Sequence, residues 1–157
     1  MLLVLLACTA GENAKADSAP ALLDDSGGIT CTGTPPVLEA VIVEDGGQIT
    51  IDAGTFNSLL VAGQATDADK DLYIVDMDIW FDDVVDGTVD TSGTALSTEP
   101  YRLIDYEPCE AASAQYGLKL PVNEDLLFSR TTYEFAVIFY DSIGLASEIG
   151  IGSGTAP

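Results

Sequence analysis

The sequence contains no histidine, and only 5 of its 157 residues are lysine or arginine. Because imidazole is the usual general base near neutral pH and a common ligand of zinc, copper and iron, its absence excludes histidine-based triads and typical zinc enzymes. The 26 acidic residues bring the formal net charge to −21, which would repel phosphate backbones, so nucleic acid is excluded as a partner. Cations are the natural counterparts of such a surface. Salt adaptation gives the same composition, and composition does not separate the two causes.

The apolar run MLLVLLAC at residues 1–8 is much shorter than the roughly 20 residues that a membrane-spanning helix needs. It is typical of the end of a signal peptide, although no lysine or arginine precedes it. The sequence Leu5-Leu6-Ala7-Cys8 resembles the lipobox of bacterial lipoproteins. The resemblance implies a signal-peptide remnant at residues 1–7, lipid on Cys8 and, because Thr9 follows, export to the outer membrane. The alternative is an apolar N-terminus with a chance cysteine.

Few large apolar residues occur between Thr9 and Pro36, where Ala, Gly, Ser, Thr, Asp and Pro predominate. This composition is typical of a flexible linker. About 25 such residues span roughly 25 to 30 Å, enough to hold a domain clear of lipid headgroups. We therefore expect residues 8–36 to form a lipidated tether.

No long helical periodicity follows Pro36, and alternation of apolar and polar residues predicts β-strands instead. In 72–81, alternation places the odd-numbered side chains, from Tyr73 to Phe81, on a core face. The even-numbered side chains lie on a largely polar face. In 132–140 both faces are apolar, which indicates a central strand. Shorter strands are expected at 37–43, 48–52, 58–65, 101–105, 115–120 and 145–151.

Turn residues separate these segments, with Asp86-Gly87 predicting a hairpin and residues 124–128 giving the only hint of helix. Seven or eight short strands predict an all-β protein, an antiparallel β-sandwich over residues 37–152, followed by a tail at 153–157.

Three stretches resemble bacterial immunoglobulin-like domains of the polycystic-kidney-disease (PKD) and cadherin-like type. They are VAGQATDAD at 61–69, IWF at 79–81, and YEFAV at 133–137 continuing into DSIGLAS at 141–147. The resemblance implies an immunoglobulin-like fold and a role in binding or adhesion. The chain departs from it by lacking W-D-F-G-D-G after Trp80 and by a longer 90–131 region.

Asp67, Asp69 and Asp71 have the D-x-D-x-D spacing that lets carboxylates surround one hard cation such as calcium. An EF-hand is excluded, because Leu72 replaces its glycine and a strand after Leu72 carries the twelfth residue away. In a cadherin-like loop site, Asp141 would join these three ligands. The alternative is an acidic turn in which the aspartates bond their own backbone.

Asp76 and Asp78 share one strand face with Trp80. Carboxylate pairs at about 6.6 Å can serve glycoside hydrolysis, and an exposed tryptophan can stack on a sugar or a partner protein. The alternative is a solvated face with Trp80 covered by the 90–131 region or by sheet packing.

Of the three cysteines, Cys31 and Cys109 remain as a pair if Cys8 carries lipid. In an oxidising compartment they are expected to form a disulfide, worth about 4 to 5 kcal/mol for a loop of about 80 residues. Two free thiols are the alternative.

These observations predict a lipid-anchored, non-catalytic binding, adhesion or spacer module of the cell envelope, with calcium as its ion, the membrane as partner through the anchor, and a protein or glycan as ligand. The alternative is a small carbohydrate-active protein that uses Asp76, Asp78 and Trp80.

Overall fold

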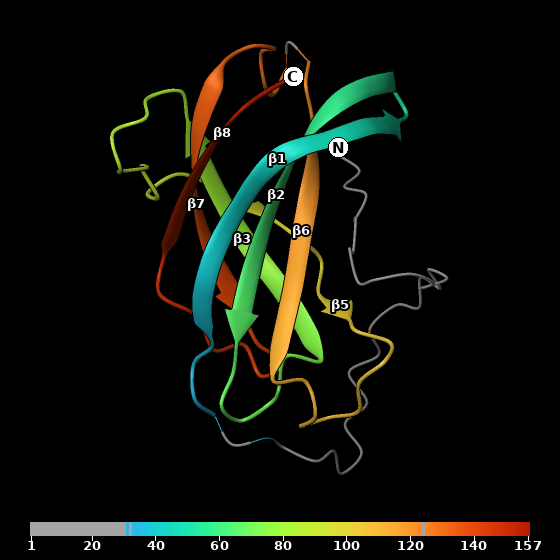
Figure 1. Cartoon of the computed structure of the whole chain (residues 1–157), viewed down its shortest axis with the longest axis vertical. Helices are drawn as coiled ribbons and strands as arrows, with labels where there is room; N and C mark the ends of the chain where they lie inside the picture. The colour runs from blue at the N-terminus through green and yellow to red at the C-terminus, as the bar shows by residue number, and fades with distance from the viewer. Residues whose placement is uncertain (1–30, 32, 124) are drawn as a thin grey trace.

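The computed structural model describes residues 31, 33–123 and 125–157, which form two antiparallel β-sheets packed against each other (Figure 1). The lipobox, Cys8 and most of the expected tether lie outside the described residues. Within the described part of the chain, no helix has the length and apolar character of a membrane span.

The first sheet has the order β1-β2-β6, with β1 at Val37–Ile51, β2 at Gly54–Thr66 and β6 at Ser113–Pro121. The second has the order β4-β3-β7-β8, and β5 pairs with the start of β3, at Ile74 and Val75. Its strands are β3 at Ile74–Asp82, β4 at Leu96–Ser97, β5 at Tyr101–Arg102, β7 at Thr132–Tyr140 and β8 at Gly150–Thr155. The predicted all-β antiparallel sandwich is confirmed.

The alternation expected along 72–81 is present in β3. Val75, Met77 and Ile79 are at most 1% exposed, whereas Asp76 and the other even positions are half-buried on the opposite face. β7 lies between β3 and β8, which confirms the expected central strand. Its inward side chains pack with those of β2 and β6, so the core lies between the two sheets. The largest fully buried side chains include Leu59, Val61, Tyr116, Leu118, Phe135 and Phe139.

A tyrosine at the start of β7 fixes the crossing from the first sheet to the second. The hydroxyl of Tyr133 accepts a hydrogen bond of 2.8 Å from the backbone N–H of Phe128, five residues upstream. A tyrosine at this corner, bonded back to the preceding loop, is a hallmark of immunoglobulin-like sandwiches.

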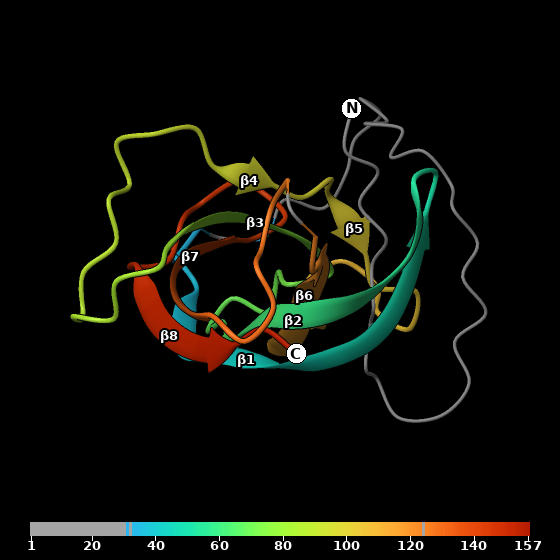
Figure 2. The same cartoon turned by 90° about the horizontal axis from the view of Figure 1, so that it is seen from above.

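The edge strands β1 and β8 meet at one corner of the sandwich (Figure 2). Glycine occupies every second position of β8, and these glycines face β1. A Cβ atom on Gly152 would lie 2.9 Å from the carbonyl oxygen of Val41, and one on Gly154 would lie 2.4 Å from a methyl of Val43. The glycines therefore let the two strands approach closely and cover each other's edges.

Some expected strand boundaries are wrong. The segments 37–43 and 48–52 form the single strand β1, because the Gly46-Gly47 region is a register shift in the pairing with β2 and not a break. The last strand is β8, not 145–151, and Ala156 beyond it is 1% exposed. Residues 153–157 are therefore part of the sandwich and not a tail.

The hairpin expected at Asp86-Gly87 is absent, because no strands flank this turn. Instead the buried carboxylate of Glu134 on β7 accepts hydrogen bonds from the backbone N–H groups of Asp86 and Gly87, at 3.3 and 2.8 Å. A tertiary contact therefore replaces the expected local pairing.

Candidate metal centre

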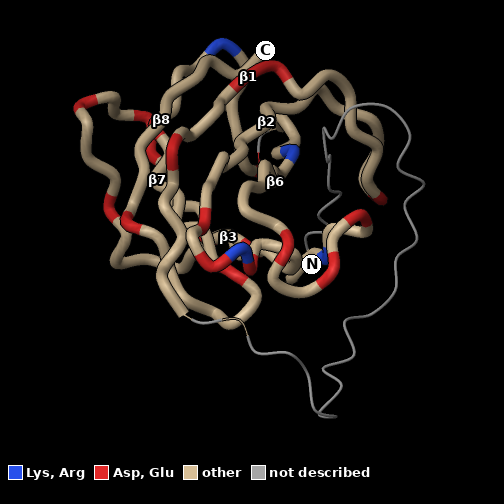
Figure 3. The backbone as a smooth tube through the Cα atoms, turned by 60° about the horizontal axis from the view of Figure 1, so that its bottom comes forward, with Lys and Arg blue, Asp and Glu red and all other residues tan. Residues whose placement is uncertain are grey.

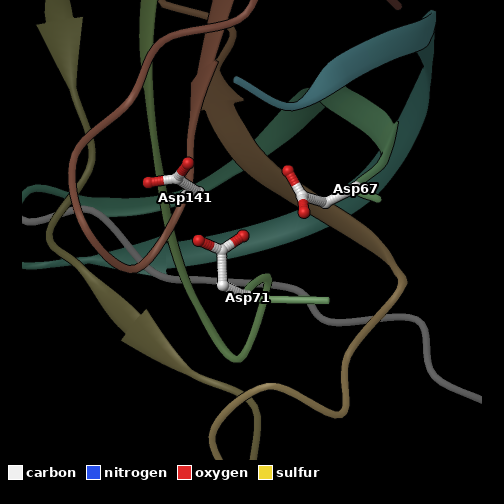
Figure 4. Close-up of side chains that lie close together, drawn as sticks. All are labelled: Asp67, Asp71 and Asp141. Carbon is white, nitrogen blue, oxygen red and sulfur yellow. The ribbon is translucent and has the colours of Figure 1, made fainter. Parts of the chain in front are cut away.

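Three aspartates from two loops converge at the end of the sandwich where β2 and β7 finish (Figure 4). Asp67 directly follows β2, Asp71 lies in the loop before β3, and Asp141 directly follows β7. The backbone N–H of Ser142 donates to the carbonyl of Asp71 at 3.2 Å, which joins the two loops. One carboxylate oxygen from each aspartate lies within 4.8 Å of those from the other two.

In Asp67 and in Asp141, one of the two carboxylate oxygens holds the residue's own loop in place. The Oδ1 atom of each accepts two backbone hydrogen bonds, which is the usual role of aspartate in a turn. The donors are the N–H groups of Asp69, Lys70, Ile143 and Leu145, at 2.6, 3.0, 3.0 and 2.8 Å. The loops are therefore fixed with their second carboxylate oxygen turned inward.

Four carboxylate oxygens of the cluster are buried without a hydrogen-bond partner: Oδ2 of Asp67, Oδ2 of Asp141 and both oxygens of Asp71. The three residues are 6%, 5% and 0% exposed, respectively. Buried polar groups nearly always have a partner, and an unpaired buried charge is costly. Among the described residues, no lysine or arginine forms an ion pair with these oxygens. The described part of the chain therefore provides no base paired with the cluster.

The surroundings raise the pKa of two of these aspartates above the ordinary value of 3.8. Burial, followed by the charges of Asp141 and Asp67, raises the pKa of Asp71 to about 7. Burial also raises the pKa of Asp141, against the backbone hydrogen bonds from Leu145 and Ile143 that lower it. Without a cation, the cluster holds a proton up to near-neutral pH; a divalent ion can replace that proton.

The chemical type of the unpartnered atoms indicates which cation the cluster could bind. All four unpartnered atoms are carboxylate oxygens, which suit hard cations, whereas zinc and copper favour nitrogen and sulfur donors. Calcium accepts six to eight oxygen ligands in flexible geometry, whereas magnesium demands a near-ideal octahedron and retains water. A buried cluster in which Asp71 offers both carboxylate oxygens fits calcium better. Acidic residues elsewhere on the domain are spread along the backbone with few basic ones between them (Figure 3).

Asp69, the fourth expected ligand, does not belong to the cluster. It is half-buried, and its Oδ2 atom accepts a hydrogen bond of 2.6 Å from the backbone N–H of Thr34. The turn closed by Asp67 directs the Asp69 side chain toward the segment before β1 instead of toward Asp71. The D-x-D-x-D spacing therefore supplies two members of the cluster and one contact to the N-terminal segment.

Sequence reasoning did not identify Ser142. Its Oγ atom is buried without a partner beside Asp141 and adds a neutral oxygen on the same loop. Nothing but its position next to Asp141 would have pointed to it.

Asp76 and Asp78 lie on the outward face of β3, as the alternation predicts. Both oxygens of Asp78 are engaged, since Ser97 Oγ donates to one and the Tyr140 hydroxyl donates to the other at 2.9 Å. Burial and this contact with Asp78 raise the pKa of Tyr140 to about 12. Burial, then the charges of Asp78 and Asp141, raises the pKa of Asp76. Asp78 therefore ties β3 to β4 and β7.

Trp80 is half-buried on the same face. Its indole N–H donates a hydrogen bond of 2.9 Å to the carbonyl oxygen of Gly93. The loop between β3 and β4 therefore contacts the ring, and the indole N–H is already bonded within the domain.

Cys31 and Cys109 are joined by a disulfide, with 5.5 Å between their Cα atoms and a sequence separation of 78. It attaches the segment before β1 to the loop before β6.

No protein-family model matches the chain, and neither the curated proteins nor the solved structures include a significant match to it.

Replacing Asp71 with the isosteric amide, Asp71→Asn, removes one buried charge and supplies N–H donors to the oxygens of Asp67 and Asp141. We expect the metal-free protein to gain about 1 to 3 kcal/mol in free energy of unfolding, measured by urea denaturation at pH 8. Asp69→Asn makes the same chemical change in the same loop but outside the cluster, and should give no such gain. An Asp71→Asn protein no more stable than the parent would contradict the unpaired state of these oxygens.

The stability of the metal-free protein should fall as the pH rises from about 4 to above 7. The pKa of Asp71 is about 7 in the folded chain against an ordinary value of 3.8, so the folded state holds this proton more tightly than the unfolded state. This contribution is complete below the unfolded pKa and is lost as the pH passes the folded pKa. Urea denaturation at a series of pH values measures it. Between these pH values, the free energy of unfolding should depend less on pH in Asp71→Asn than in the parent. Identical slopes of free energy against pH in the two proteins would refute the raised pKa of Asp71.

Proposed function

We propose that this chain is an exported, calcium-stabilised β-sandwich module with a non-catalytic binding, adhesion or spacer role, held at the bacterial outer membrane by lipid on Cys8. The observation that carries the proposal is the set of four buried, unpartnered carboxylate oxygens of Asp67, Asp71 and Asp141. A divalent cation satisfies them together and removes their mutual repulsion.

The position of the cluster explains why the ion would stabilise the whole domain. Asp67 ends β2 in the first sheet, whereas Asp141 ends β7 in the second sheet. An ion bound by both joins the two sheets at their common end, with Asp71 from the connecting loop as a third ligand. Extracellular calcium modules have dissociation constants of about 10⁻⁴ to 10⁻³ M, so the site would fill outside the cytoplasm.

Two further features support export. A disulfide such as Cys31–Cys109 persists in oxidising compartments and is rare in the cytosol. The apolar run before Cys8 is the pattern of a lipoprotein signal peptide, and this part of the proposal rests on the sequence alone.

The contacts of the outward β3 face support a non-catalytic role. A catalytic carboxylate must be able to reach a substrate, but both oxygens of Asp78 already accept hydrogen bonds from side chains of this domain. The indole N–H of Trp80 is likewise engaged by Gly93. We therefore assign these residues to the attachment of neighbouring strands and not to glycoside hydrolysis.

Calcium should raise the melting temperature of the purified protein, because an ion that binds only the folded state stabilises it. At about 100 times the dissociation constant, the gain is about 2.7 kcal/mol, equivalent to roughly 10 °C for a domain of this size. Thermal melts monitored by circular dichroism, with calcium and then with excess chelator, measure the shift.

Magnesium at the same concentration should give a much smaller shift, and Asp71→Asn should give almost none with calcium. Asp69→Asn should retain most of the shift. A calcium response that survives in Asp71→Asn would place the ion elsewhere and refute the site.

The anchor is tested separately in cells. Labelled fatty acid should be incorporated into the full chain, which should fractionate with the outer membrane. The Cys8→Ser variant should lose both the label and the membrane association. A Cys8→Ser protein that keeps the label would exclude lipidation at this residue.

A further inference from the structure

The disulfide lies next to the backbone that positions the metal ligands. Cys109 is two residues before Ala111, whose carbonyl accepts a hydrogen bond of 3.2 Å from the N–H of Leu72 and which forms a β-bridge with Asp71. The next carbonyl, that of Ala112, accepts a hydrogen bond of 2.9 Å from the N–H of Asp67. The segment after Cys109 therefore fixes the backbone at two of the three ligands.

The other half of the disulfide holds the segment before β1 against both metal loops. Cys31 is 8% exposed. Thr34 donates its backbone N–H to Asp69, in the loop that carries Asp67 and Asp71. A Cβ atom on Gly33 would lie 3.0 Å from the side chain of Ile143 and 3.0 Å from that of Leu145, in the loop that carries Asp141.

The backbone of Cys109 also needs support. Its φ of 65° lies in the left-handed region, which residues other than glycine seldom adopt. Such a conformation is unfavourable and persists only where the surrounding structure imposes it. The covalent bond to Cys31 supplies that constraint.

We infer that the metal cluster and the Cys31–Cys109 disulfide are coupled, so that the oxidised chain binds calcium more tightly than the reduced chain. The inference rests on the proposed calcium site and adds its regulation by the redox state of the chain. The physical reason is preorganisation. Without the disulfide, the segments at Cys31 and Cys109 gain conformational freedom, and calcium binding must then order the backbone that the disulfide otherwise holds.

The coupling must be reciprocal, because calcium and the disulfide act on the same folded state. Bound calcium therefore makes the disulfide harder to reduce. In the reduction by a dithiol such as dithiothreitol, the S–S bond breaks and Cys31 and Cys109 each take up one electron and one proton. The reagent supplies both electrons and both protons and closes to its own cyclic disulfide.

The first test compares calcium affinity in two forms of the full chain that differ only at this bond: the native protein and Cys31→Ser/Cys109→Ser. Isothermal titration with calcium chloride at low temperature gives both dissociation constants, and circular dichroism establishes that both forms keep their β-structure. We expect an affinity about tenfold lower without the disulfide, within the usual range of allosteric coupling. Equal affinities in the two folded forms would overturn the inference and leave the calcium site intact. No binding by the native protein would overturn the proposed function itself.

The second test needs no cysteine variant and so does not depend on whether that variant folds. The native protein is equilibrated with mixtures of reduced and oxidised dithiothreitol in calcium or in chelator, and its free thiols are counted with a chromogenic reagent after acid quenching and removal of the dithiothreitol. We expect the reduction at equilibrium to need about tenfold more reductant in calcium. In Asp71→Asn, which keeps both cysteines, calcium should make no difference. Equal reduction of the native protein in the two conditions would contradict the coupling.

Discussion

The burial of three carboxylates in one small volume is the constraint on which the loop end of this domain depends. Two unit charges 4 Å apart repel by about 4 kcal/mol at an effective dielectric constant of 20, and the cluster contains three aspartates. Water does not relieve this repulsion, because Asp67, Asp71 and Asp141 are nearly fully buried. Only a proton or a cation can reduce the repulsion among the carboxylates, and either one keeps the two loops together. The raised pKa of Asp71 and the proposed calcium site are therefore two consequences of one arrangement.

The sandwich supplies this arrangement through the positions at which its strands end. β2 and β7 lie in opposite sheets, and their last residues are followed at once by Asp67 and Asp141. Each aspartate uses one oxygen to close its own turn, which holds the other oxygen in a fixed direction. The cluster is thus organised by the protein's own hydrogen bonds, and the side chains would lose little freedom on binding a cation. The disulfide extends the same organisation to the segment before β1.

Local patterns predicted the elements whose two faces differ, and they failed where a distant contact decides the conformation. Alternation in β3 identified the buried Val75, Met77 and Ile79 because each side chain's direction follows from the pleat alone. The glycines at 46 and 47 suggested a break, but pairing with β2 carries the strand through them as a bulge. Asp86-Gly87 suggested a hairpin, but it is held by Glu134 from β7, which lies 47 residues further along the chain.

The sequence alone determined the all-β class, the central strand, the acidic loops and the set of cysteines, because alternation and composition act through neighbouring residues. It also grouped Asp67, Asp71 and Asp141, which the structure brings together, as candidate metal ligands. Only the tertiary structure decided that Asp69 turns away toward Thr34, and that the other three meet without a compensating base among the described residues. The physical reason is that the cost of a buried charge depends on everything packed around it, and that surrounding comes from segments far apart in the chain.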